Sequence, residues 1–205
     1  MMKSMCCSWY DSLFSLGYDE GRHAADQESA ILENSQALEK FLAGMERRAF
    51  RRAQIATGNR DEALDIVQDA MFALVSKYAN KSPADWELLF HRILSRRIID
   101  WHRQSKFRAG FSSWFGRDNT DTEQLEYEDE TGLSPEQNWQ LGESIQVLDA
   151  LLRDLPLRQQ QVFLLRAWEG LSEKETARAM SCTVGTVKTH YSRARTYLRV
   201  RLQET

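Results

Sequence analysis

Residues 171–198 read LSEKETARAMSCTVGTVKTHYSRARTYL, and their spacing sets the expectation for the whole chain. Ser172 followed three positions later by Glu175 is the pattern of a capping box, which predicts that a short helix begins here. The turn Ser181-Cys182-Thr183 comes next, and Thr183 is suited to cap a second helix. Apolar residues recur in that second helix at helical spacing, at Val184, Val187, Tyr191, Ala194 and Leu198. Two short helices joined by such a turn predict a helix-turn-helix.

The outward positions of the second helix favour binding to nucleic acid. A recognition helix enters the major groove by its N-terminal end, where side chains reach phosphates and base edges. The groove-facing positions here are small or basic: Thr186, Lys188, Thr189 and His190, with Arg193 and Arg195 further along for backbone phosphates. An αα-hairpin with a solvated basic face is the plainer alternative. Because no acidic residue interrupts 184–201 and both caps are present, the pattern favours DNA binding.

Charge is sorted along the 205 residues and divides the chain. Lys and Arg dominate 91–108 and 184–201, whereas 118–143 carries nine Asp and Glu and neither Lys nor Arg. The length suits two small domains. The sequence therefore predicts a variable extension at 1–35, a helical domain at 36–108, an acidic flexible linker at 109–139 and a second helical domain at 140–203.

Helix boundary signals predict an all-α fold. Asn59 precedes Glu62 with the spacing of a capping box, and an amphipathic pattern follows to Tyr78. Pro83 and Pro135 each follow a serine and suit the first position of a helix. There is no sequence signal for β-hairpins, and only 3 of the residues are proline.

Several function classes have no support in the sequence. The four histidines lie far apart, and no metal-ligand spacing or nucleophile motif appears, so we expect no catalytic site, no cofactor and no metal. No apolar run is long enough to span a membrane, and the N-terminus lacks the pattern of a signal peptide. Three cysteines, with Cys6 and Cys7 adjacent, cannot form a disulfide framework, and a reduced cytoplasmic protein is expected.

The basic segment 91–108 differs from the helix-turn-helix because aromatic residues accompany its cations. Trp101 and Phe107 lie inside it, and three more aromatic residues follow within 111–115. Aromatic rings interleaved with cations suit unstacked bases better than an intact duplex. The alternative is that Trp101 belongs to the core and the arginines are solvated, and the residues leave both interpretations open.

Together these stretches resemble the extracytoplasmic-function (ECF) group of bacterial RNA polymerase sigma factors. DEALDIVQDAMFALVSKY (61–78) resembles region 2.2 of that family, and WELLFHRILSRRIIDWHRQSK (86–106) resembles regions 2.3 and 2.4. Residues 155–198 resemble region 4. The order of regions matches, and the linker falls where the family has one.

The resemblance implies roles for three sets of residues. On the region 2.2 helix Asp65, Gln68 and Asp69 would meet the clamp coiled coil of the β′ subunit of core polymerase, although an ordinary amphipathic surface helix would look the same. Bases of the −10 element would be captured by Arg92, Arg96, Arg97, Asp100, Trp101, Arg103 and Lys106. The −35 duplex would be read by Thr183, Gly185, Thr186, Lys188, Thr189, His190, Arg193 and Arg195. Many members have Asn where this chain has Arg96, so the choice of −10 bases is expected to differ.

The resemblance also implies partners. Core polymerase and promoter DNA are expected, together with an anti-sigma factor. The acidic linker would thread the polymerase cleft, where it either mimics nucleic acid or serves as a solvated tether. The alternative function is a stand-alone helix-turn-helix regulator whose N-terminal domain binds another protein.

Overall fold

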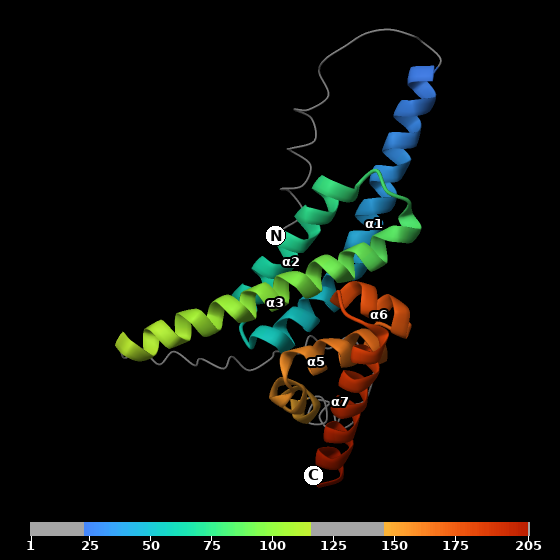
Figure 1. Cartoon of the computed structure of the whole chain (residues 1–205). Coiled ribbons are helices and arrows are strands. Elements are labelled where there is room, and N and C mark those ends of the chain that lie inside the picture. Colours follow the sequence, from blue (N-terminus) through green and yellow to red (C-terminus); the bar gives the residue numbers. More distant parts are fainter. Residues whose placement is uncertain (1–22, 116–145, 205) are drawn as a thin grey trace, which may run out of the picture.

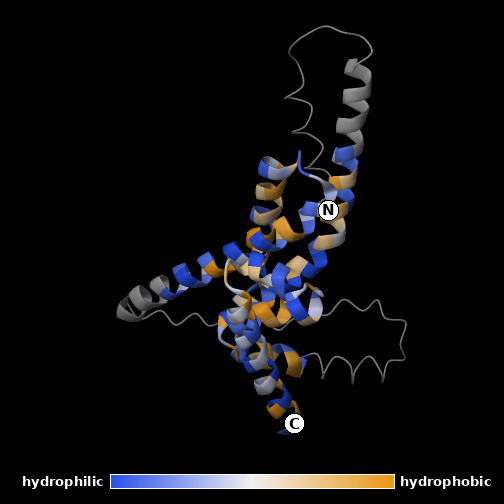
Figure 2. Cartoon of the chain, turned by 45° about the vertical axis from the view of Figure 1, so that its right-hand side comes forward, coloured by the Kyte–Doolittle hydropathy of each residue, from blue (hydrophilic) through white to orange (hydrophobic). Residues whose placement is uncertain are grey.

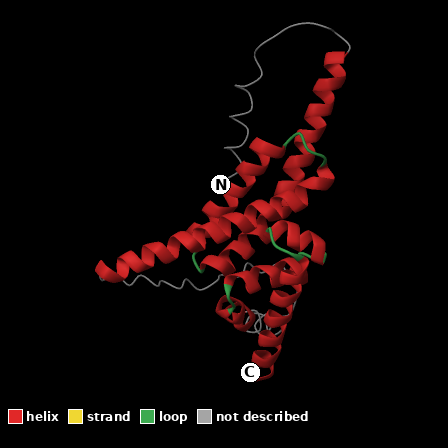
Figure 3. Cartoon of the chain, in the orientation of Figure 1, coloured by secondary structure: helices red, strands yellow, loops and turns green. Residues whose placement is uncertain are grey.

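The computed structural model of the chain describes residues 23–115 and 146–204 (Figure 1). Every element in these two ranges is helical, joined by short turns, and no strand occurs among the described residues (Figure 3). The predicted all-α fold is confirmed. Most of the acidic linker, the helix expected after Pro135, and Cys6 and Cys7 lie outside the described residues.

The N-terminal unit consists of α1 (His23–Thr57), α2 (Arg60–Tyr78) and α3 (Pro83–Phe115). The side-chain oxygen Oδ1 of Asn59 accepts a hydrogen bond from the backbone N of Glu62 at 3.0 Å, as its position predicted. The Glu62 carboxylate accepts from Nε1 of Trp101 on α3 at 2.6 Å, and the backbone N of Asn59 donates to Oγ1 of Thr57. The sequence predicted that the Glu62 side chain would complete a capping box with Asn59. In the structure this side chain instead contacts Trp101 of α3.

An apolar core joins the three helices of this unit. Trp86, Phe90, Leu94 and Ile98 of α3 are fully buried against α1 and α2. Their spacing places one face of α3 toward its own unit, which is the amphipathic pattern that the sequence showed.

The C-terminal unit contains a helix over 146–154, followed by α5 (Leu157–Phe163), η1 (Leu164–Trp168), α6 (Glu173–Met180) and α7 (Val184–Glu204). Pro156 separates the first two helices, as expected from its fixed φ and missing N–H. The single π-helical turn η1 continues α5 and ends before Gly170, which has φ of +73°.

Apolar clusters also connect the two units. Leu88 and Ile99 of α3 pack against the cluster that holds the helix-turn-helix together, and Ile55 of α1 belongs to the cluster under α7. Hydrophobic segments accordingly gather where the helices cross in the centre of the molecule (Figure 2). The described parts of the two units therefore form one packed body.

Two helices are longer than the sequence indicated. Helix α1 begins at His23, inside the predicted extension, and α3 continues to Phe115, beyond residue 108. No proline occurs between Pro83 and Pro135, so nothing in the backbone forces α3 to end at 108. The sequence did not indicate that α3 continues beyond residue 108, because its aromatic and charged residues there do not recur at helical spacing.

His91 of α3 is buried among charged groups of α1, α3 and the turn after η1. Its Nδ1 lies 3.3 Å from Nη1 of Arg52, and its Nε2 lies 3.9 Å from carboxylate oxygens of Glu87 and Glu169. Burial lowers the pKa of His91 to about 3, and the positive charges of Arg52 and Arg48 act in the same direction. The ring is therefore neutral in the folded protein at pH 7.

We expect the free energy of unfolding to fall as the pH drops from about 6.5 toward 3. In that window the unfolded chain binds a proton at His91 and the folded chain does not, so acid favours unfolding. Between pH 7 and pH 5 this difference amounts to up to about 2 kcal/mol. Urea unfolding of the wild type and of His91→Gln at both pH values measures it. Equal losses in the two proteins would contradict the prediction.

Candidate nucleic-acid interface

The predicted helix-turn-helix forms with both of its caps. In the capping box, the backbone N of Ser172 donates to the Glu175 carboxylate at 2.7 Å, and the backbone N of Glu175 donates to Oγ of Ser172 at 3.2 Å. Ser181 turns the chain with φ of +50°, and Oγ1 of Thr183 accepts from the backbone N of Thr186 at 3.1 Å. Helix α7 is thereby fixed at its N-terminal end, where the sequence placed the reading residues.

Helix α7 buries one side and exposes the other. Val187, Ala194 and Leu198 are buried, and the phenol ring of Tyr191 stacks on Phe163 with ring centroids 6.0 Å apart. At about 100° per residue, Gly185 and Thr189 lie in the middle of the exposed side, with Lys188 and Arg195 on one flank and Arg193 on the other. The exposed half of α7 therefore has basic side chains along both of its edges.

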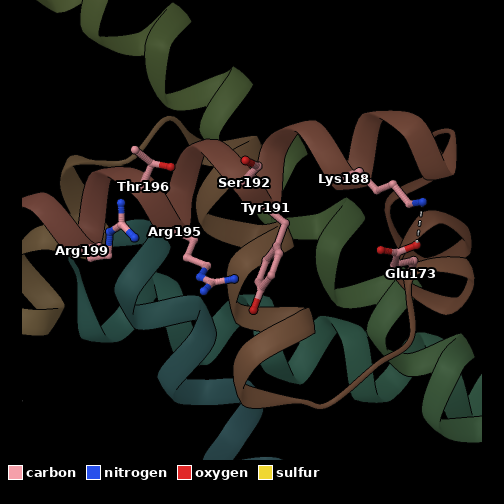
Figure 4. Close-up of a pocket in the computed structure, with 7 residues that line it drawn as sticks. All are labelled: Glu173, Lys188, Tyr191, Ser192, Arg195, Thr196 and Arg199. Atoms are coloured by element: carbon pink, nitrogen blue, oxygen red, sulfur yellow. Dashed lines mark ion pairs between the residues drawn. The ribbon is translucent and has the colours of Figure 1, made fainter.

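A basic groove of about 340 Å³ runs along the first flank. Figure 4 shows Lys188, Arg195 and Arg199 along one side of α7, with Nζ of Lys188 3.5 Å from the Glu173 carboxylate of α6. Ser192 and Thr196 add hydroxyl groups to the lining. Three cations and several hydroxyl donors in one groove make a surface suited to phosphate oxygens.

The second flank is less polar. Thr186 and His190 line a groove of about 280 Å³ together with Cys182 and Arg158. Burial lowers the pKa of His190, with further lowering by the charges of Arg193 and Arg158, so its ring is neutral at pH 7. Burial raises the pKa of the Cys182 thiol, as expected for a thiol in the turn that acts as a small apolar residue.

The residues predicted on α3 fall on two sides of that helix. At about 100° per residue, Arg92, Arg96, Arg103 and Lys106 share a stripe with Leu88, Ser95 and Ile99. These four cations are exposed. We call this surface the basic stripe of α3.

Arg97 and Trp101 lie on the side of α3 that faces α2. Nη1 of Arg97 is 3.2 Å from the Asp69 carboxylate, and the indole of Trp101 is half-buried against the apolar core. Asp100 lies between the two sides and pairs with Arg96 and Arg103 at 3.8 and 3.3 Å. The structure thus gathers only part of the predicted set on the basic stripe.

An exposed face of α2 carries Asp65, Gln68 and Asp69, as predicted. Ile66 and Val67 on the opposite face are buried, and Met71 packs at the edge of the core. Phe72 lies on the exposed face, and 75% of its surface is accessible. Among the described residues, no other large apolar side chain is as exposed. We call this surface, Asp65, Gln68, Asp69 and Phe72, the α2 face.

Known proteins share these features. A family model described as sigma-70, region 4, matches residues 145–198, which include the helix-turn-helix. RNA polymerase sigma factor SigV of Bacillus subtilis strain 168 is 31% identical over 146 residues, covering 70% of this chain and 78% of that protein. The chain belongs to the RNA polymerase sigma factors.

Further relatives place this sigma factor in the ECF group. ECF RNA polymerase sigma factor SigD of Mycobacterium tuberculosis H37Rv is 28% identical over 149 residues, covering 70% of this chain and 65% of that protein. Sigma factor RpoE of Bartonella quintana, solved in complex with the anti-sigma factor NepR, shares the fold with a TM-score of 0.63. That match has 19% identity and covers 80% of this chain and 96% of RpoE. Sigma factors are polymerase subunits that direct transcription initiation and are not themselves enzymes.

Sequence reasoning missed two parts of these surfaces. Arg199 extends the basic groove of this sigma factor, and its spacing of four from Arg195 was a usable signal. Phe72 was overlooked because it falls outside the inward-facing period of α2. An apolar residue out of phase with the buried face is the signal that identifies it.

Ser172→Ala should destabilise the C-terminal unit by about 1 kcal/mol, because it removes the acceptor for the Glu175 amide. Hydrogen bonding to the Glu175 carboxylate by the side chain and the backbone N of Ser172 lowers the pKa of Glu175. The stabilisation from the charged carboxylate is therefore present above the usual carboxyl pKa and is lost as the pH falls through the lowered pKa. Denaturant unfolding at pH 7 measures the cost. Ser181→Ala, at an exposed turn position, is the matched control, and equal effects of the two changes would argue against the capping role.

Proposed function

We propose that this sigma factor binds the β′ clamp coiled coil of core polymerase through the α2 face. It captures unpaired −10 bases along α3 and reads the −35 duplex with α7. The observation that carries the proposal is exposure: three helices each present a separate polar surface, and the chain's family assigns one task to each. A stand-alone regulator would need no second nucleic-acid surface on α3 and no exposed apolar residue on α2.

The chemistry of the α2 face supports a protein partner. Asp65 and Asp69 provide negative charge, Gln68 provides an amide, and Phe72 provides an apolar anchor within the same two turns. A buried aromatic anchor surrounded by polar residues is the usual composition of an interaction hot spot. Such a face suits a coiled coil that carries basic and polar side chains.

The chemistry of α3 supports single-stranded DNA. Unpairing and unstacking a base costs a few kcal/mol, so a surface that holds melted DNA must supply compensating contacts. The basic stripe offers four exposed cations for the backbone. Trp101 lies outside this stripe, on the side of α3 that faces α2, where Glu62 fixes the indole by a hydrogen bond.

An inhibitory protein partner is part of the proposal. A partner that covers the α2 face or the basic stripe would prevent polymerase or promoter binding. RpoE, whose fold this chain shares, was solved in complex with the anti-sigma factor NepR.

Phe72→Ser should weaken binding to core polymerase by about tenfold or more, because a central aromatic anchor is removed. Its folding stability should change by no more than about 0.5 kcal/mol, since the side chain is exposed. Val200→Ser on α7, which removes another exposed apolar side chain, is the control. Titration of labelled protein with core polymerase gives both affinities. If Phe72→Ser binds as the wild type does while Asp65, Gln68 and Asp69 changed to Ala abolish binding, the anchor role is wrong.

Lys188→Gln and Arg193→Gln should each lower promoter affinity of the holoenzyme and reduce the salt dependence of binding by about one counterion. The two residues flank α7 on opposite edges, so a helix seated in the major groove contacts both phosphate walls. Lys77→Gln at the end of α2 is the control for the charge change. Promoter binding across a series of salt concentrations provides the measurement. A loss confined to one flank would contradict insertion of α7 along the groove.

A further inference from the structure

We infer that Glu173 of α6 is a specificity-determining residue of −35 recognition, because it holds Lys188 of α7 away from phosphates until α7 is seated on its own sequence. The inference rests on the proposed function and adds a residue that opposes binding to other DNA. It concerns the basic groove along the first flank of α7, where both side chains lie (Figure 4).

Glu173 is an acid in a groove that is otherwise suited to phosphate. Among the described residues that line the groove, three are cations, Lys188, Arg195 and Arg199, and only Glu173 is acidic. Its carboxylate lies 3.5 Å from Nζ of Lys188. Within 23–115 and 146–204, no ion pair joins Arg195 or Arg199 to an acid. One of the three cations in the groove is therefore restrained, and two are available to phosphates.

Lys188 is the cation of the groove closest to the reading end of α7. At about 100° and 1.5 Å per residue, Lys188, Arg195 and Arg199 share one stripe that is about 16 Å long. Lys188 stands at its N-terminal end, next to the exposed Thr189. Because a recognition helix enters the major groove by its N-terminal residues, the position of Lys188 depends most on how deeply α7 is inserted.

Helix α6 has a complete cap without Glu173. Ser172 and Glu175 exchange the two hydrogen bonds of the capping box. Glu175 also supplies an acid in the first turn, where negative charge is favourable. The plainer interpretation, in which Glu173 only adds to this favourable charge, predicts an effect on stability and none on DNA binding.

The ion pair is exposed enough to break easily. The side chains of Lys188 and Glu173 are 63% and 42% exposed. Exposed pairs contribute little to stability, because water screens both charges. Lys188 can therefore exchange the carboxylate of Glu173 for a phosphate oxygen when DNA approaches.

On DNA of the wrong sequence this exchange brings little gain. Non-specific binding consists of contacts with phosphates. When Lys188 turns to a phosphate, the Glu173 carboxylate loses its cation and faces phosphates in the same groove, where like charges repel. Lys188 thus stays with Glu173, and DNA of random sequence meets one cation fewer.

On the −35 element the balance differs. Contacts of α7 with base edges hold the helix in one register, which keeps Nζ of Lys188 against the same phosphate. The exchange then accompanies base contacts that other sequences lack. Glu173 consequently weakens binding to random DNA more than binding to the promoter, and specificity is this difference between two affinities.

The experiment compares the wild type with Glu173→Gln, which removes the charge and keeps the size of the side chain. Fluorescence anisotropy measures binding of the full chain to a random-sequence duplex over a series of salt concentrations. We expect Glu173→Gln to bind this duplex about fivefold more tightly at low salt, with a salt dependence steeper by about one counterion. On a promoter mapped by its transcription start site, affinity of the holoenzyme should rise by no more than about twofold.

A second substitution tests whether Glu173 acts through Lys188. In the Glu173→Gln background, Lys188→Gln should return the salt dependence on the random duplex to that of the wild type, because the freed cation is gone. In the wild-type background the same change should lower the salt dependence on the promoter only. A residue that merely stabilised α6 would not produce this pattern.

A control separates the site of the charge from the charge itself. Glu204→Gln removes the acid of another exposed ion pair, which Glu204 forms with Arg201 at the far end of α7, outside the groove. Circular dichroism and urea unfolding check that each variant folds. An equal gain in binding to the random duplex by Glu204→Gln and Glu173→Gln would mean that net charge alone acts, which would overturn the inference.

The remaining outcomes are distinct. Equal binding of the random duplex by the wild type and Glu173→Gln, or a steeper salt dependence that persists without Lys188, would overturn the restraint. An equal rise in affinity for promoter and random duplex would overturn the role in specificity. If no holoenzyme, wild type included, binds promoter fragments, the proposed function fails, while the random duplex still decides whether Glu173 restrains Lys188.

Discussion

A fully buried guanidinium constrains how the rest of the molecule packs. Burial lowers the pKa of Arg52 to about 10, which still leaves it charged at pH 7. A charge removed from water must be hydrogen-bonded on all sides, or the fold loses several kcal/mol. Ser95, His91 and Gln161 supply those partners from two other helices. The relative positions of α1, α3 and α5 follow from this one requirement.

The π-helical turn η1 also places a charged group near the buried Arg52. Its wider turn ends with the backbone N of Glu169 donating to the carbonyl of Leu164, five residues earlier. The carboxylate of Glu169 then lies beside Arg48 and near His91. Burial raises the pKa of Glu169, while Arg48 and Arg52 act against that shift, so neighbouring cations favour its charged form. A π-turn is rare, and this one places an acid beside Arg48 and near the buried cation Arg52.

Local signals in the sequence predicted most of the helices but not their contacts. Ser172, Thr183 and Asn59 cap helices where their spacing indicated, because caps depend on residues three apart. Arg52 looked like any other arginine of an amphipathic helix, since its partners lie 39 to 109 positions away. Trp101 was left between two interpretations: its half-buried indole packs on the core and hydrogen-bonds to Glu62 at the edge of α2, while its contact with unpaired bases stays a prediction. Phe72 was missed for the opposite reason, because its importance lies in having no contact with the core.

The ion pair between Asp69 and Arg97 joins two surfaces to which we propose different tasks. Asp69 belongs to the α2 face and Arg97 to α3, and their side chains meet at 3.2 Å although both are largely exposed. A partner that takes Asp69 releases Arg97, which then has a free guanidinium on the helix assigned to melted DNA. The pair is too exposed to stabilise the fold appreciably. If polymerase docks on the α2 face as we propose, it alters the charge that α3 offers to the −10 strand. The two proposed tasks lie on one three-helix unit, so this coupling needs no movement of the backbone.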